Sequence, residues 1–325
     1  MQILTDADPP LAPAERTVVT IGAYDGVHLG HRAVIAEVRS RAAAMGCASA
    51  AVTFDRHPAQ VIRPDSAPLL LTDLDQKLEL LADTGIDYTM VVGFDEQRAT
   101  ESAEHFVESV LVDRLGAAAV VVGEDFHFGH NRRGNVALLT DMGARAGFEV
   151  LGHKLVGPDG LAARDDAQVS STAIRRALNE GRLADANSML GRPHEMRGDV
   201  VPGDRRGRTL GFPTANVAIP DEMLVPGDGI YAGWLERGRG APGPELLPAA
   251  IYVGKRPTFY DDRAMTLLEV HVLDFTGDLY GERVGVRFTH RIRADARFAS
   301  MDELAAQLQV DCDRARQLLG VGTGS

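Results

Sequence analysis

A change in the hydrophobic pattern at about Arg192 divides the sequence into two parts that call for different folds. Before it, short β-branched runs alternate with amphipathic stretches that have helical spacing. Strands that alternate with helices imply a parallel sheet with right-handed crossovers. We predict strands at 17–22, 48–54, 88–94, 117–123 and 147–153, and helices at 31–44, 73–83, 102–114 and 134–146.

After the change, glycine and proline become dense and strands follow one another without helices between them. Runs of this kind predict a compact antiparallel barrel, with strands at 229–236, 247–253, 267–275 and 282–293. One helix is predicted from about Met301 to Leu319. The sequence therefore predicts an α/β domain at 1–182, with a Rossmann-like parallel sheet, and an antiparallel β-barrel domain with a C-terminal helix at 183–325.

Bulk properties restrict the partners and the compartment. A length of 325 residues suits two domains, and the formal charge of −12 disfavours nucleic acid and anionic membranes as partners. Cys47 and Cys312 are far apart, which argues against a disulfide framework or a structural zinc site. The first residues are acidic and proline-rich, and no apolar run approaches the length of a membrane span, so we expect a cytoplasmic protein.

The stretch GAYDGVHLGH at residues 22–31 directly follows the first predicted strand. In parallel α/β folds, ligands bind at this edge of the sheet. His28 and His31 are three residues apart at the start of a helix, so both imidazoles can face one point beside free backbone N–H groups. This pattern favours a cradle for a triphosphate. The alternative is a pair of histidines that cap the helix or border the core.

This stretch resembles the HxGH motif of the nucleotidyltransferase superfamily, and its longer form, GxxDGVHxGH, resembles the flavin branch. The resemblance implies that His28 and His31 contact the phosphates of ATP and stabilise charge on the departing pyrophosphate. Tyr24 replaces a phenylalanine that is usual in the family. The other residues of the motif that we expect at the phosphates are Gly22, Asp25, Gly26 and Gly30.

A second motif, VSSTAIRRAL at residues 169–178, is similar to the SSTxIR element of the same superfamily. The resemblance implies that Arg175 acts in catalysis and that Ser170, Ser171 and Thr172 bind the ATP phosphates. Arginine suits this role because a guanidinium can bind phosphate through two hydrogen bonds. Taken alone, the element would match any capped helix that carries an arginine. The upstream HLGH, a domain length away, makes the match specific.

Two further loops follow predicted strands. TFDRHP at 53–58 is similar to a TFxxHP turn, and VGEDFHFG at 122–129 resembles a VGxDFxFG loop of the family. These resemblances imply that His57, Asp125 and Phe126 lie near the nucleotide or the flavin. The alternative for each is an ordinary turn with a buried aromatic residue. The spacing of His57, His127 and His130 fits no zinc template.

The most informative stretch of the second part is GDVVPGDRRGRTLGFPTANV at residues 198–217. Gly203 and Gly207 allow a loop whose N–H groups wrap phosphates, and Arg205, Arg206 and Arg208 lie nearby. In an extended chain Thr214 and Asn216 face the same side, so their oxygens could hold one hard cation such as Mg²⁺. The alternative is a glycine-rich hairpin with exposed arginines.

This stretch resembles the riboflavin kinase motif GxVVxGxxxGxxLGFPTAN. The resemblance implies that Thr214 and Asn216 bind Mg–ATP while the loop at 203–210 covers the phosphates. LLEVHVLDF at 267–275 resembles a VExHxxDF strand, which makes Glu269 the general base for the ribityl 5′-hydroxyl rather than one more carboxylate on an edge strand. IRADARF at 292–298 resembles LRxExxF, which implies that Arg293 and Phe298 lie toward the flavin. Asp295 replaces a common glutamate there.

With its motifs in order from about 17 to 319, the chain is identified as a member of the bacterial-type bifunctional FAD synthetases. Membership implies phosphorylation of riboflavin by ATP, then transfer of AMP from ATP to FMN, with Mg²⁺ as cofactor. The expected small-molecule partners are riboflavin, FMN, FAD, ATP and ADP, and we expect a monomer or a weak homo-oligomer. The alternatives are a protein with a single activity and a non-catalytic flavin-binding regulator. The residues that argue against both are His28, His31, Arg175, Thr214, Asn216 and Glu269.

Overall fold

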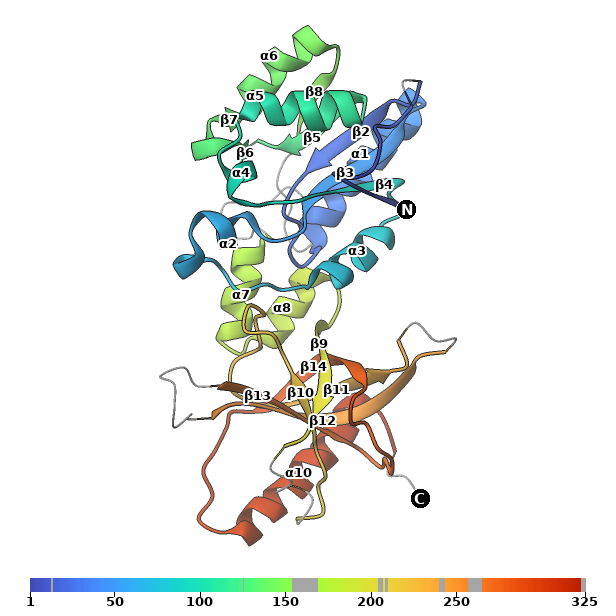
Figure 1. The fold of residues 1–325 in the computed structure, drawn as a ribbon. Coiled ribbons are helices and arrows are strands. Elements are labelled where there is room, and N and C mark those ends of the chain that lie inside the picture. Colours follow the sequence, from blue (N-terminus) through green and yellow to red (C-terminus); the bar gives the residue numbers. More distant parts are fainter. Residues whose placement is uncertain are drawn as a thin grey trace. The chain divides into compact units, whose positions relative to one another are not determined.

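A computed structural model describes residues 1–12, 14–124, 126–153, 169–203, 207, 210–239, 243–256 and 265–322 (Figure 1). The chain forms two compact units, Met1–Ser171 and Thr172–Ser325, and each is described by itself. The sequence-based boundary at 182/183 stays a prediction. Among the described residues, none of the helices combines the length and the apolar character that crossing a bilayer requires.

The first unit is built on a six-stranded sheet with the order β1-β4-β3-β2-β5-β8, and all its pairings are parallel. The central strands are almost fully buried, as expected for a sheet covered on both faces. The strands are β1 (Gln2–Thr5), β2 (Thr17–Ile21), β3 (Ala48–Phe54), β4 (Tyr88–Val92), β5 (Ala117–Gly123) and β8 (Glu149–His153).

Helices pack on both faces of this sheet. One face carries α1 and α3, with Ile35 and Leu81 in contact with the buried side of β3. The other carries α5, its π-helical continuation η2, and α6, whose Leu139 joins the largest core cluster. The helical segments are α1 (Leu29–Met45), α2 (Pro58–Ile62), η1 (Pro64–Ser66), α3 (Leu74–Ala82), α4 (Glu96–Ala99), α5 (Ala103–Phe106), η2 (Val107–Arg114), η3 (His130–Arg132) and α6 (Val136–Ala146), with a small β6 (His127–Phe128) and β7 (Gly134–Asn135) hairpin.

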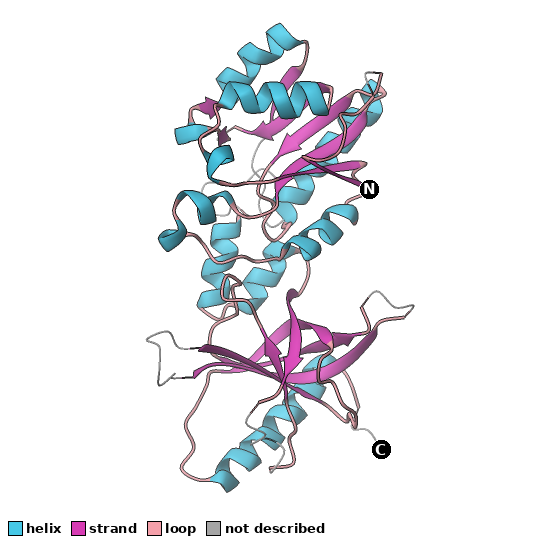
Figure 2. Cartoon of the chain, in the orientation of Figure 1, coloured by secondary structure: helices cyan, strands magenta, loops and turns pink. Residues whose placement is uncertain are grey.

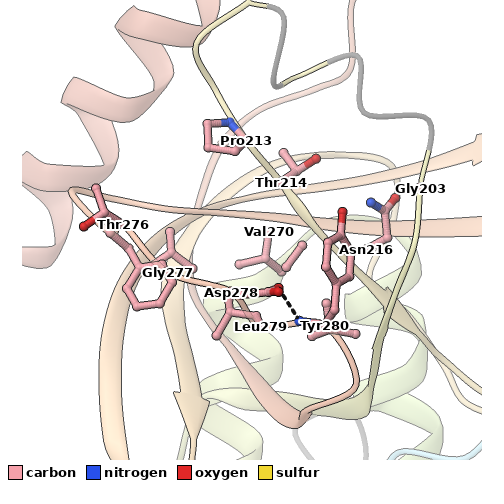
Figure 3. Close-up of a pocket in the computed structure, with 14 residues that line it drawn as sticks. Gly203, Pro213, Thr214, Asn216, Val270, Thr276, Gly277, Asp278, Leu279 and Tyr280 are labelled. Atoms are coloured by element: carbon pink, nitrogen blue, oxygen red, sulfur yellow. Dashed lines mark hydrogen bonds between the residues drawn. The ribbon is translucent and has the colours of Figure 1, made fainter.

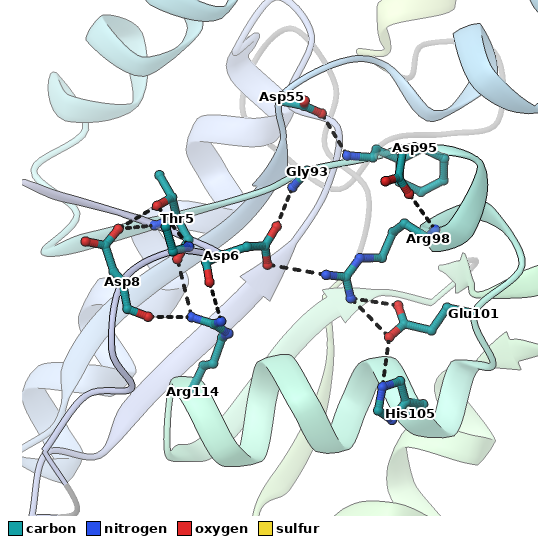
Figure 4. Close-up of polar contacts among 12 residues, drawn as sticks. Thr5, Asp6, Asp8, Asp55, Gly93, Asp95, Arg98, Glu101, His105 and Arg114 are labelled. Carbon is teal, nitrogen blue, oxygen red and sulfur yellow. Dashed lines mark hydrogen bonds and ion pairs between the residues drawn. The ribbon is translucent and has the colours of Figure 1, made fainter.

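The edge strand β1 and the segment after it were not predicted. Arg114 fixes this segment by donating hydrogen bonds to the carbonyls of Thr5, Asp6 and Asp8 (Figure 4). The Asp6 carboxylate in turn accepts from the backbone N–H of Gly93, just beyond β4, at 2.7 Å. These contacts hold the start of the chain to the carboxyl edge of the sheet.

The second unit is a closed antiparallel barrel with the strand order β10-β13-β12-β11-β14-β9 (Figure 2). Its strands are β9 (His194–Val201), β10 (Ala215–Ala218), β11 (Gly229–Arg237), β12 (Glu245–Arg256), β13 (Met265–Val272) and β14 (Arg283–Arg293). Helices α7 (Ser171–Asn179) and α8 (Leu183–Leu190) precede the barrel. Helix α10 (Met301–Leu319) packs on its outer face, where Cys312 and Ala315 contact Ala232 and Ala250.

The predicted fold class is confirmed: a parallel α/β unit, then an antiparallel barrel and a C-terminal helix. The five strands predicted in the first part and the helix at 301–319 are all present. The structure corrects the prediction at 267–275, since β13 begins at Met265 and ends at Val272. It also adds β9 and β10, which were not predicted as strands and which flank the glycine-rich loop.

Candidate active sites

The histidine pair of the first unit lies where α1 begins. His28 is the N-cap, and its Nδ1 accepts a hydrogen bond from the backbone N–H of His31 at 3.3 Å. The two rings stack with centroids 3.6 Å apart and planes 17° apart. Because Nδ1 of His28 accepts, the neutral ring carries its proton on Nε2, a donor suited to a phosphate oxygen. The predicted pairing of the imidazoles is therefore present, and His28 is both a cap and a member of the pair.

The loop before α1 has an unusual backbone. Tyr24 and Val27 have φ values of 48° and 37°, and Gly26 lies between them with φ of 85°. A β-branched residue in this region is rare and costs about 1–3 kcal/mol. The surroundings must therefore hold the loop in place. Tyr24 contributes by donating from its hydroxyl to Thr20 Oγ1 at 2.8 Å, and burial raises the pKa of this phenol.

The Ser-Ser segment of the second motif reaches this loop. Ser171 Oγ donates to the carbonyl of Asp25 at 2.9 Å. Gly30 lies so close to the backbone of Val169 that a Cβ added at Gly30 would be 3.3 Å from the Val169 carbonyl oxygen. The structure therefore brings Ser171 beside the loop at 22–28, here called the histidine loop. The binding of Ser170 and Ser171 to ATP phosphates stays a prediction. Thr172 and Arg175 belong to the second unit, and their approach to the histidines stays a prediction.

The other predicted residues of this unit have local partners. His57 caps α2: its Nδ1 accepts from Ala59 N at 3.2 Å, and its backbone N–H donates to Gln60. Phe126 is half-buried and stacks on Phe128, with ring centroids 5.4 Å apart. Their proximity to flavin or nucleotide stays a prediction. Asp125 lies outside the described residues.

In the barrel unit, the predicted cation ligands and the predicted base come from neighbouring strands. Asn216 of β10 is the cross-strand partner of Glu269 of β13, so their side chains share one face of the sheet. This is the outer face, because their neighbours Ala215 and Val270 are buried inside the barrel. Thr214 and Asn216 both line a pocket of about 460 Å³ (Figure 3).

The pocket combines these polar groups with apolar surface, and residues 275–280 form another part of its wall. Val200, Val270 and Val272 supply apolar surface, and Asp278 accepts a hydrogen bond from the backbone N–H of Tyr280 at 3.0 Å (Figure 3). A mixed lining of this kind, concave and mostly apolar with a few polar groups, is typical of small-molecule sites.

The glycine-rich loop approaches both predicted ligands. A Cβ at Gly203 would lie 2.2 Å from Asn216 Nδ2, and one at Gly207 would lie 3.6 Å from Thr214 Oγ1. Gly203 therefore allows a contact with Asn216 that a larger residue would prevent. Arg205 and Arg208 lie outside the described residues.

The third predicted group of this unit lies at the end of β14. The Arg293 guanidinium donates to Asp311 of α10 at 2.7 Å and lies over the Phe298 ring, 5.6 Å from its centroid. Asp311 is buried, so a charge partner is necessary there. Arg293 and Phe298 thus lie together, and Arg293 is oriented by a residue on another element. Their approach to the flavin stays a prediction.

Three residues with potential roles were missed at the sequence level. His271 shares a strand with Glu269, and its Nδ1 bonds the carbonyl of Pro213 at 2.8 Å, directly before Thr214. Burial lowers the pKa of His271, which favours the neutral ring. Asp278 lines the pocket, and Lys77 is a lysine on the apolar side of α3. Two of these residues could have been found from the sequence: His271 is the histidine of the VExHxxDF pattern, and Lys77 is a charged residue three positions before Leu80, on the apolar side of a predicted helix.

Comparisons with known proteins cover both units. A family described as FAD synthetase matches residues 11–173, and one described as riboflavin kinase matches residues 190–319. The bifunctional riboflavin kinase/FMN adenylyltransferase of Escherichia coli (strain K12) is 39% identical over 310 residues, which cover 95% of each chain. Proteins of the same name from Haemophilus influenzae and Bacillus subtilis are 36% and 33% identical, over 92% of each chain.

A solved structure described as a macrolide-efflux protein from Streptococcus pneumoniae is also similar. It is 29% identical, with a TM-score of 0.82, and the match covers 97% of this chain and 98% of that one. The two family matches and the full-length relatives agree with the two candidate sites, one in each unit. This chain therefore belongs to the family of bifunctional riboflavin kinase/FMN adenylyltransferases.

Proposed function

We propose that this protein phosphorylates riboflavin to FMN in its barrel unit and adenylylates FMN to FAD in its parallel-sheet unit. One observation supports this above the others: each unit carries its own nucleotide-site framework, built from a different set of residues. The first has the stacked His28 and His31. The second has Asn216 paired with Glu269 across neighbouring strands, and Thr214 and Asn216 lining one pocket.

For adenylyl transfer, a phosphate oxygen of FMN attacks the α-phosphorus of ATP, and the bond to pyrophosphate breaks. The nucleophile is already an anion, so the reaction needs alignment and charge neutralisation rather than a dedicated base. We assign the neutralisation to His28, His31 and Arg175, with further phosphate contacts from Ser170, Ser171 and Thr172. Backbone N–H groups at the start of α1 add to the positive potential.

For the kinase reaction, Glu269 accepts the proton of the ribityl 5′-hydroxyl while that oxygen attacks the γ-phosphorus of ATP and ADP departs. The nucleotide occupies the pocket beside Asn216. The loop at Gly203 and Gly207 covers the phosphates, and Arg293 and Phe298 contact the flavin. His271 keeps Pro213, and with it Thr214, in position.

The side chains at the pocket suit a magnesium ion. Thr214 and Asn216 offer neutral oxygen ligands, and magnesium prefers a few protein oxygens completed by water and substrate phosphates. Bound there, the ion would neutralise charge on the phosphates. The described residues contain no group of three or more His, Cys, Asp or Glu side chains that could form an all-protein metal site. The cytoplasmic location and the monomer or weak homo-oligomer stay predictions.

The test is incubation of the purified protein with riboflavin, ATP and magnesium, followed by chromatographic separation of the flavins. We expect FMN and then FAD, with ADP and pyrophosphate as the other products. Formation of FMN without FAD would show that the protein has only riboflavin kinase activity. Bound but unchanged riboflavin would identify a non-catalytic flavin-binding regulator, and either result would overturn the bifunctional proposal.

A further inference from the structure

A segment from a distant part of the sequence, Leu71–Lys77, makes several hydrogen bonds to the histidine loop. The Asp25 carboxylate accepts from the backbone N–H groups of Leu71 at 2.9 Å and Thr72 at 3.1 Å. Gly26 N–H donates to Thr72 Oγ1 at 3.1 Å. The segment therefore binds the loop through two successive residues, in the region where the backbone is strained.

Lys77 extends this attachment from α3. Its ammonium donates to the carbonyl of Phe54, the last residue of β3, at 2.7 Å. It also donates to the carbonyl of Ala23, in the histidine loop, at 3.4 Å. One side chain thus joins the end of β3, where the TFDRHP turn begins, to the loop after β2. Thr53 Oγ1 donates to the same Ala23 carbonyl at 3.2 Å.

The position of Lys77 is costly for a cation. The residue is 7% exposed, and burial lowers the pKa of its ammonium to about 8, against the opposing effect of Asp25 and Asp55. It faces these two carboxylates, one from each of the loops that it joins. An apolar side chain would pack beside Leu80 and Leu81 without a desolvation penalty, so packing alone does not account for a lysine here.

We propose that Leu71–Lys77 is a positioning element for adenylyl transfer, with Lys77 as its cationic anchor. By holding Ala23 and Phe54 together, Lys77 fixes the loop that carries His28 and His31. Its charge also offsets Asp25 and Asp55, which would otherwise repel a triphosphate. Lys77 acts through the loop and needs no contact with substrate. The inference rests on the proposed function of the first unit.

The experiment compares Lys77→Met with Lys77→Arg in the full chain, measuring FAD formation from supplied FMN and ATP. Because displacement of about 1 Å at catalytic groups can cost on the order of 100-fold in rate, we expect kcat to fall by about that factor in Lys77→Met. We expect the KM for FMN to change little, and Lys77→Arg to keep at least about a tenth of the wild-type kcat, since it restores the charge and the donors.

Asp83→Asn is the matched control, because it removes an exposed charge at the end of the same helix, outside Leu71–Lys77, and should leave kcat unchanged. FMN formation by the same preparations reports on the second unit, and limited proteolysis reports on folding of the first. If Lys77→Met does not fold, Thr72→Val tests the element by removing the partner of Gly26 N–H, with an expected kcat loss of at least about tenfold.

An Lys77→Met protein that folds and keeps kcat within twofold of wild type would overturn the inference, as would an unaffected Thr72→Val. An arginine variant as inactive as the methionine variant would also contradict it, because both charge and donors would then be insufficient. Failure of the wild-type protein itself to form FAD would instead refute the proposed function. The two failures are therefore distinguishable.

Discussion

Gly203→Ala tests whether the glycine-rich loop must lie directly against the predicted magnesium ligand. A Cβ at this position would be 2.2 Å from Asn216 Nδ2 and 2.6 Å from its Oδ1, whereas real Cβ contacts essentially never fall below 3.0 Å. The Asn216 amide or the loop must therefore retreat by roughly 1 Å, a displacement that can cost on the order of 100-fold in rate. We expect kcat/KM for riboflavin phosphorylation to fall about 10- to 100-fold, or about 1.4–2.7 kcal/mol of transition-state stabilisation.

The assay is the initial rate of FMN formation at several concentrations of magnesium and ATP. Gly322→Ala is the matched control, since it makes the same chemical change where a Cβ would meet nothing within 4 Å. FAD formation from supplied FMN should be unchanged in both variants, because that site belongs to the other unit. A Gly203→Ala protein with kinase activity within twofold of wild type would refute the argument from close approach.

Three further predictions address the other residues. His28→Ala and His28→Asn should both lower FAD formation by at least about 100-fold and leave FMN formation intact. The asparagine variant separates the two roles of His28, because asparagine preserves the helix cap but not the imidazole. Comparable loss of both activities would contradict separate sites. Glu269→Gln should stop FMN formation yet permit FAD synthesis from supplied FMN, and surviving kinase turnover would place the base elsewhere. Burial lowers the pKa of His194 to about 4, so as the pH falls this imidazole is protonated in the unfolded state before it is protonated in the folded state. The free energy of unfolding should therefore decline by about 3 kcal/mol from pH 6.5 to 4. Urea unfolding followed by Trp234, the single tryptophan, measures this in wild type and His194→Gln, and equal pH dependence in the two would contradict it.

Features that depend on local sequence were predictable. The buried β-branched run at 48–54 and the capped helix at Met301–Leu319 appear where the pattern places them. The spacing of His28 and His31 at a helix start predicts that both imidazoles can face one point, and in the structure the two rings stack. In each case neighbouring residues carry the whole signal.

Features that depend on distant partners were not predictable. Strand β9 has His194 and Gly198 at two of its buried positions, beside Met196 and Val200, so its inner face lacks the run of apolar side chains that predicts a strand. The charges on its outer face also depend on distant residues: Glu195 accepts from Arg197 of the same strand at 2.7 Å, from Arg239, beyond β11, at 2.7 Å and from Arg287 of β14 at 3.0 Å. Lys77 likewise gains its role only because folding brings residues 23 and 54 to one point.

Strand β1 has a practical consequence for handling this protein. It covers the outer edge of β4 through parallel pairing from Gln2 to Thr5. Deleting the first eight residues would uncover the N–H and C=O groups of β4 and create an edge on which other molecules can pair and aggregate. Affinity tags therefore belong after α10, and proteolytic trimming of the amino terminus is expected to reduce solubility before it reduces either activity.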